Sequence, residues 1–146
     1  MPITVRQAVQ ASPPLAAALR TLLAQLTGQP VAVDHATLEQ VLAQPGVMLL
    51  VAEDEGGGVV GTATLALLRK ASGWMARLED VVVDTSARGR GVGAALTLEA
   101  AQLAQAAGAH QLELTSAPHR QAANRLYQRL GFQQHETNVY RLPLTP

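Results

Sequence analysis

Hydrophobic positions recur at helical spacing in four stretches of the chain. Leucines three, four and seven positions apart mark one face of the first stretch, where Ser12 suits an N-cap and Gly28 a C-terminal stop. Asp34 can cap the second stretch in the same way. The predicted helices run from Ser12-Pro13 to Gly28, from Asp34 to Pro45-Gly46, from about Gly91 to Ala107, and from Pro118 to Gly131.

Apolar runs and alternating positions predict the strands between these helices. The predicted strands run from Ile3 to Arg6, Val47 to Ala52, Val59 to Leu68, Met75 to Asp84, Gln111 to Thr115 and Gln133 to Leu142. Hairpins join the central strands, while the helix that starts near Gly91 forms a right-handed parallel crossover. We therefore expect an α/β fold with a mixed, mostly antiparallel sheet of six to seven strands and helices on both faces. Residues 1–146 fit a single domain.

A glycine-spaced loop joins the strand that ends at Asp84 to the long helix that follows. Glycines at a helix start let the backbone approach a ligand closely, and the free N–H groups there attract anions. We expect a phosphate on this loop, although an ordinary strand-to-helix turn is the alternative. The spacing differs from the dinucleotide and Walker fingerprints. The loop consists of Arg88, Gly89, Arg90, Gly91, Val92 and Gly93.

The loop and a second motif together resemble the GNAT superfamily of acetyl-CoA-dependent N-acyltransferases. The second motif is the run Leu126-Tyr127-Gln128-Arg129-Leu130-Gly131-Phe132, which is typical of the last helix of that superfamily. The run Glu79-Asp80-Val81-Val82-Val83 is also similar to glucosamine-phosphate N-acetyltransferases. The resemblance is strong from Leu78 to Leu142 and rests on element order before Leu78.

The resemblance implies where acetyl-CoA binds. Backbone N–H groups from Arg88 to Gly93 would hold the pyrophosphate, with Arg88 and Arg90 adding charge, although Arg90 is equally compatible with a solvated surface position. The backbone of Val81, Val82 and Val83 would bind the pantetheine arm like an added strand and polarise the thioester. The side chains of Val81 and Val83 themselves are expected in the core.

Three further side chains gain roles from the resemblance, each beside a structural alternative. Tyr127 would protonate the leaving thiolate, or it is a core tyrosine with its hydroxyl at the surface. Asn124 would contact the pantetheine or the loop, or it is a polar residue on the helix face. Glu79 would accept the amine proton, directly or through water, or it forms a salt bridge with Arg77. Glu79 and Asp80 are expected on opposite faces of the strand.

Composition narrows the classes of partner. Eleven basic residues balance eleven acidic ones, so a basic nucleic-acid surface is not expected. The chain has no cysteine, and its four histidines are not spaced as metal ligands, so we expect no metal site. It has no apolar run long enough for a membrane span, and we expect no signal peptide, because no charged segment followed by an apolar one opens the sequence. A cytoplasmic location is the expectation, with a homodimer left open.

The sequence thus predicts transfer of an acetyl group from acetyl-CoA to a primary amine by direct attack. The alternative is a catalytically silent module that binds coenzyme A and regulates. The acceptor, a small molecule or a peptide, is not readable. The connection from Thr27 to Val33, which would face it, is short and weakly charged.

Overall fold

The computed structural model describes residues 2–145 and falls into two compact units. The first unit extends to Thr115 and contains the sheet and three α-helices. The second begins at Ser116 and contains one α-helix.

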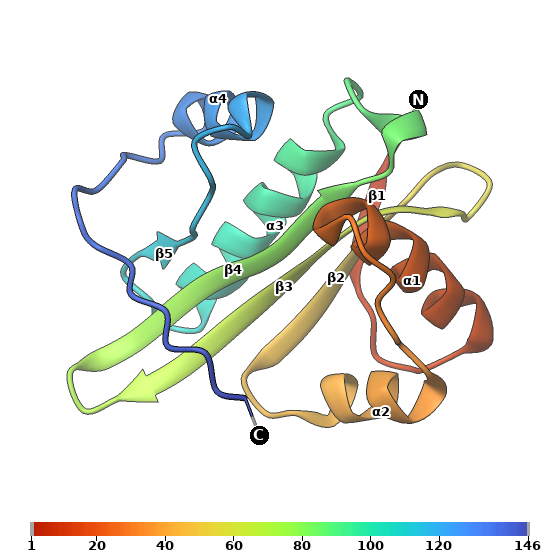
Figure 1. The fold of residues 1–146 in the computed structure, drawn as a ribbon, viewed down its shortest axis with the longest axis horizontal. Helices are drawn as coiled ribbons and strands as arrows, with labels where there is room; N and C mark the ends of the chain where they lie inside the picture. Colours follow the sequence, from red (N-terminus) through yellow and green to blue (C-terminus); the bar gives the residue numbers. More distant parts are fainter. Residues whose placement is uncertain (1, 146) are drawn as a thin grey trace. The chain divides into compact units, whose positions relative to one another are not determined.

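The sheet of the first unit has five strands whose order in space is their order along the chain (Figure 1). The strands are β1 (Thr4–Gln7), β2 (Val47–Glu53), β3 (Val59–Lys70), β4 (Gly73–Val83) and β5 (Leu112–Glu113). Neighbours from β1 to β4 pair antiparallel, and β5 pairs parallel to β4 after the crossover through α3 (Val92–Ala106). The predicted mixed, mostly antiparallel sheet is confirmed.

The first two helices begin at the predicted caps, and the first also ends at its predicted glycine, while the second ends at Ala43 with Gln44 as its C-cap, just before the predicted Pro45-Gly46. Ser12 caps α1 (Pro13–Thr27) by accepting a hydrogen bond from the Leu15 N–H at 3.3 Å. Gly28 ends this helix in the left-handed region, with φ of 73°. Asp34 caps α2 (His35–Ala43) through its carboxylate, which accepts the Thr37 N–H at 2.8 Å. Side-chain oxygens thus satisfy first-turn donors that have no partner within their helix.

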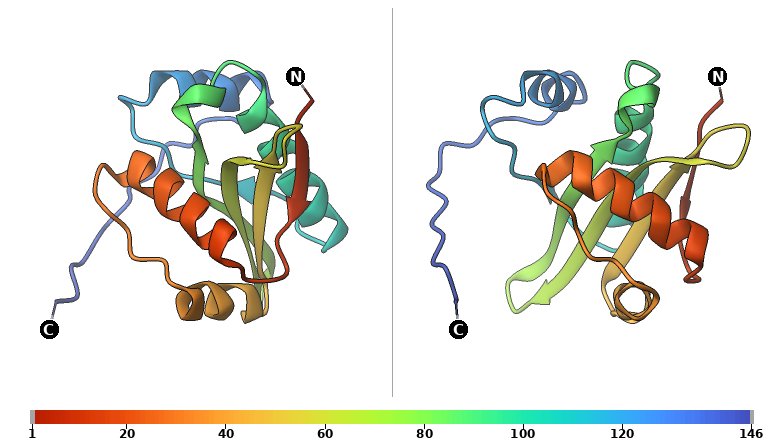
Figure 2. Two further views of the ribbon diagram at one scale, coloured as in Figure 1. Left: turned by 90° about the vertical axis from the view of Figure 1, so that its right-hand side faces the viewer. Right: turned by 45° about the vertical axis from the view of Figure 1, so that its right-hand side comes forward.

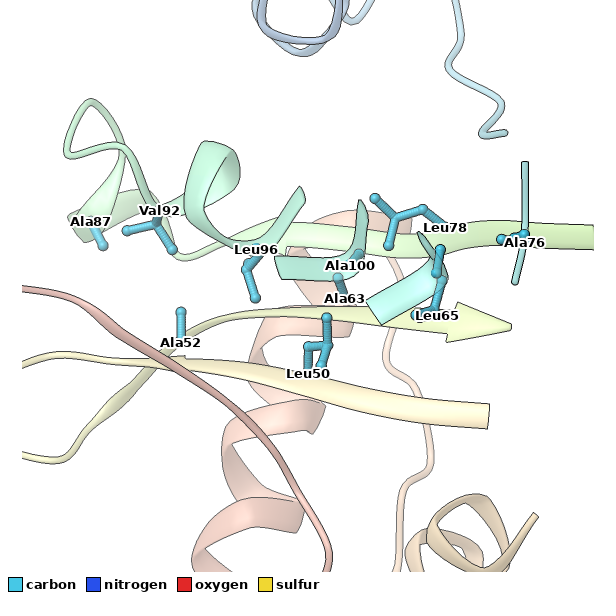
Figure 3. Packing of buried hydrophobic residues seen from close by; sticks show 12 residues of the cluster. Leu50, Ala52, Ala63, Leu65, Ala76, Leu78, Ala87, Val92, Leu96 and Ala100 are labelled. Carbon is cyan, nitrogen blue, oxygen red and sulfur yellow. The ribbon is translucent and has the colours of Figure 1, made fainter. Parts of the chain in front are cut away.

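Each face of the sheet is covered by helices, with α1 and α3 on opposite sides (Figure 2). Successive side chains of β2 point to opposite faces of the sheet, so both faces are apolar and both can be covered by helices. Leu50 and Ala52 belong to the cluster under α3, whereas Leu49 and Val51 belong to the cluster with α1 and α2. Figure 3 shows the first of these clusters. Its fully buried members from the helix and the strands include Leu96, Ala100, Leu50, Ala63 and Leu65.

Two predictions for the end of the chain are wrong. The second unit has no strand over Gln133 to Leu142, so the described sheet has five strands and not six to seven. A strand needs a hydrogen-bonding partner and usually a buried face, but this segment has no partner among the described residues, and Val139 and Tyr140 are 69% and 88% exposed. The last helix, α4 (Gln121–Arg129), starts three residues after Pro118.

Candidate functional site

One edge of β4 is open over its second half. β4 pairs with β5 only through Ala76 and Arg77, opposite Leu112 and Glu113. Its other edge stays paired with β3 as far as Val83. Within the described residues, the stretch from Leu78 to Val83 therefore has no strand on the β5 side. An unpaired edge of this kind presents backbone N–H and C=O groups to a ligand.

A β-bulge lies in the open stretch. Ala63 of β3 stands opposite two residues of β4, Asp80 and Val81, and Asp80 adopts a left-handed φ of 52°. The extra residue reverses the alternation, so Val81 and Val83 pack against the α3 cluster and Val82 is buried separately. The prediction that the side chains of Val81 and Val83 belong to the core is confirmed. The regular alternation assumed for Glu79 and Asp80 is interrupted here.

The two acidic residues at the bulge, Glu79 and Asp80, have different surroundings. Arg77 Nε donates to Glu79 Oε1 at 2.9 Å, so the predicted salt bridge of Glu79 is present. Burial raises the pKa of the Asp80 carboxyl, and the negative charge of Glu79 raises it further. The open edge thus carries one carboxylate paired with a cation and one carboxyl that holds its proton more strongly than usual.

The predicted phosphate loop leads from the open edge into α3. A short 3₁₀ turn, η1 (Thr85–Ala87), follows β4, and Gly91 is the N-cap of α3 with φ of 77°. No side chain caps this helix start, which leaves its first-turn N–H groups to other partners. A Cβ built at Gly89 or Gly91 would meet no atom within 4 Å, so the space beside the loop is open. Arg88 Nε donates to the Val83 carbonyl at 3.4 Å.

A glutamine of α1 holds the start of this loop and was not foreseen. Gln25 Nε2 donates to Asp84 Oδ1 at 2.7 Å, and Gln25 Oε1 accepts the Thr85 N–H at 3.1 Å. Asp84 also accepts hydrogen bonds from the backbone N–H and the hydroxyl of Ser86. The bonds from Ser86 and then Gln25 lower the pKa of Asp84. These two contacts of Gln25 join residues that are 59 and 60 positions apart in the sequence, so no local motif could have indicated this role.

The second unit contains the other two candidate side chains. Tyr127 is buried, and its ring packs edge-on against Phe132 at a centroid distance of 5.6 Å. Burial raises the pKa of its hydroxyl above the usual 10, partly offset by the positive charge of Arg120. Asn124 Nδ2 donates to the carbonyls of Ala117 and Arg120, each at 2.9 Å. Only Asn124 Oδ1 could therefore contact a ligand without breaking these local bonds.

Among residues 2–145, no group of three or more His, Asp or Glu side chains is placed to hold a metal ion. None of the described helices has the length and apolar character that crossing a membrane requires.

Comparison with known proteins places this geometry in a family. The profile of the acetyltransferase (GNAT) family matches residues 16–132. A glucosamine 6-phosphate N-acetyltransferase of Trypanosoma brucei brucei is 31% identical over 124 residues, and the match covers 81% of this chain and 82% of that protein.

Solved structures agree in fold. A Trypanosoma brucei acetyltransferase is 28% identical with a TM-score of 0.80, over 98% of this chain and all of that one. An aminoglycoside acetyltransferase from an uncultured soil sample has a TM-score of 0.87 over 99% and 97% of the two chains. At 19% identity, that likeness concerns the fold alone.

The chain belongs to the GNAT acetyltransferase family. It is an acyltransferase, with acetyl-CoA as the family's co-substrate and an amine as acceptor.

Proposed function

We propose that this protein binds acetyl-CoA along the open edge of β4 and the loop before α3, and acetylates a primary amine by direct attack. The observation that carries this proposal is the continuity of two backbone features. The unpaired stretch from Leu78 to Val83 leads through η1 into a helix start with no side-chain cap. An extended pantetheine arm fits the first feature, and a pyrophosphate fits the second.

The loop would hold the pyrophosphate through its backbone. N–H groups of Gly89, Gly91 and the first turn of α3 are donors of the required kind, and the helix dipole favours a negative charge there. Arg88 and the exposed Arg90 add positive charge beside them. Val81, Val82 and Val83 contribute their backbone to the pantetheine arm, since their side chains are packed inward.

The proton transfers are assigned to two side chains. The amine must lose a proton before it attacks the thioester carbonyl, and Glu79 is half-exposed, with one carboxylate oxygen held by Arg77. We assign Glu79 to accept this proton, directly or through water. As the carbon–sulfur bond breaks, Tyr127 donates its hydroxyl proton to the thiolate. This hydroxyl carries its proton at neutral pH, because its pKa is ordinarily near 10 and burial raises it further. Asn124 would contribute Oδ1 to coenzyme A binding.

The acceptor is proposed to be a small primary amine. The trypanosomal relative acts, by its name, on glucosamine 6-phosphate, which makes amino sugar phosphates the first class to test. A free-thiol release assay with acetyl-CoA would compare glucosamine 6-phosphate, glucosamine and a peptide with a free N-terminus. If the protein turned over none of these amines, and no amine in a wider panel either, the result would favour the catalytically silent module.

Cofactor binding is tested by thermal unfolding with a matched pair of glycine variants. Saturating acetyl-CoA at ~100 times its dissociation constant should add about 2.7 kcal/mol to the stability of the wild type. Gly91→Val should abolish this shift, because a branched side chain blocks backbone approach to the phosphates. Gly57→Val is the control, since Gly57 has a similar φ of 80° and equally open surroundings in the β2–β3 turn. Equal shifts in both variants would contradict the placement of the phosphate.

A further inference from the structure

The point at which β4 and β5 separate is spanned by a single guanidinium group. Arg77 is the last β4 residue paired with β5, where it stands opposite Glu113. Beyond this position the β5 side of β4 is open, and residues after Glu113 no longer belong to a strand. Arg77 therefore occupies the residue position at which the separation begins.

The Arg77 side chain contacts both branches of the separation. Nε donates to Glu79 on β4 at 2.9 Å, two residues past the last pair. Nη2 donates to the Thr115 hydroxyl at 3.0 Å, two residues past the last pair on the other segment. Nη1 lies 3.6 Å from Oε2 of Glu113, the cross-strand partner. Only arginine, with five donors in a planar fork, can make these three contacts together.

The surrounding side chains fix the face on which this network lies. Ala76, Leu78, Leu112 and Leu114 pack in or against the α3 cluster, so the alternating residues between them face the other way. Gln111 extends the network, since its Nε2 donates to Glu113 Oε1 at 2.9 Å. The side chain of Arg77 is 28% exposed, so it is partly shielded from solvent.

We infer that Arg77 is a positioning residue for acetyl transfer: it fixes where and how far β4 and β5 separate, and it orients the Glu79 carboxylate. This inference rests on the proposed function, in which the pantetheine arm enters the open edge of β4. Arg77 does not touch the reacting atoms in this role. It acts through the width of the separation and through the orientation of Glu79.

The expected signature is a selective loss of affinity for the pantetheine part of the co-substrate. Arg77→Gln should raise the acetyl-CoA dissociation constant and KM by roughly tenfold, because the two branches lose their common tie. Binding of 3′-phospho-ADP, which keeps the pyrophosphate and lacks the pantetheine arm, should stay at the wild-type value. The acetyl-CoA dissociation constant and KM of Arg77→Lys should lie between those of the wild type and Arg77→Gln, because an ammonium group is a point charge without the planar fork.

Arg6→Gln is the matched control. Arg6 forms an ion pair with Glu53 at the opposite edge of the sheet, between β1 and β2. Breaking a partly exposed pair should cost little stability at either place. If Arg77 were only one more surface pair, both variants would lower the melting temperature alike and leave the acetyl-CoA KM unchanged. That result would overturn the inference.

Thr115→Val provides a second and milder test that does not depend on the folding of Arg77→Gln. It removes the acceptor on the far branch and should raise the acetyl-CoA KM in the same direction. Adding it to Arg77→Gln should cause no further rise, because the contact is already lost. Independent, multiplying effects would refute the shared contact. Failure of the wild type to bind acetyl-CoA in calorimetry would instead overturn the proposed function, on which this role depends.

Discussion

Gly61 of β3 allows the start of α3 to pack directly on the sheet, and its replacement gives a sharp test of this packing. A Cβ built at Gly61 would lie 2.8 Å from Cγ1 of Val92 and 3.1 Å from Cδ1 of Leu96. Ordinary van der Waals contact begins at 3.4 Å. The leucine can adjust its rotamer, but Val92 is β-branched and its χ1 is nearly fixed in a helix. Gly61→Ala must therefore push the first residue of α3 away from the sheet.

The expected cost follows from two opposing effects. Overpacking a core costs about 1–3 kcal/mol, and replacing glycine by alanine within a strand gains about 0.5–1 kcal/mol. We expect a net loss of roughly 1–2 kcal/mol for Gly61→Ala. Val92→Ala alone removes two methylene equivalents at about 0.8 kcal/mol each and leaves a cavity. In the double variant the new methyl group fills part of that space, so the two costs should fall short of additivity by about 0.5 kcal/mol or more.

Urea unfolding of the wild type, both single variants and the double variant measures this coupling. Because Val92 belongs to the loop and is the first residue of α3, Gly61→Ala should also weaken acetyl-CoA binding, and the double variant should recover part of it. A Gly61→Ala protein as stable as the wild type would refute the packing argument. Strictly additive costs would refute it as well.

Three other substitutions test the site. Because the folded state raises the pKa of Asp80, this carboxyl favours folding below its ordinary pKa, and the benefit is lost as the pH rises through the folded value. Asp80→Asn, which tolerates the left-handed backbone, should therefore gain more in melting temperature at neutral than at acidic pH, and an equal change at both would be inconsistent with the shift. Gln25→Leu should weaken acetyl-CoA binding several-fold, since the start of the loop loses both of its bonds from α1, and unchanged calorimetric affinity would count against this. Tyr127→Phe should lower turnover with a genuine acceptor by roughly 10²-fold where chemistry limits the rate. Tyr140 is exposed, so Tyr140→Phe is the control and should keep wild-type turnover. Full activity of Tyr127→Phe would exclude the acid role of Tyr127.

Local chemistry made much of the fold predictable. Ser12, Gly28 and Asp34 act on backbone groups within four residues of themselves, so their roles as caps could be recognised from the sequence. The glycine loop was predictable for the same reason, because Gly91 adopts a positive φ at a helix start. In each case the sequence neighbours supply the whole interaction.

The missed features depend on distant partners. The bulge at Asp80 has no glycine to mark it, and it is defined only by the register of β4 against β3. The hydrogen bond from Gln25 to Asp84 joins residues that are 59 positions apart in the sequence. The expected strand from Gln133 to Leu142 is absent for a related reason, since its exposed residues bury no face and no partner strand pairs with it in the described chain.

The open half of β4 also bears on how this protein resists aggregation through its sheet edge. An unpaired edge with three successive valines is a template on which a strand of another molecule could add, as in aggregation. Two features of β4 oppose such an addition. The bulge at Asp80 breaks the regular spacing of backbone groups, and the adjacent Glu79 and Asp80 place two acidic groups at the same edge. A flexible, non-peptide chain such as a pantetheine arm does not need that regular register. The same irregularity can thus admit a thioester and reject a β-strand.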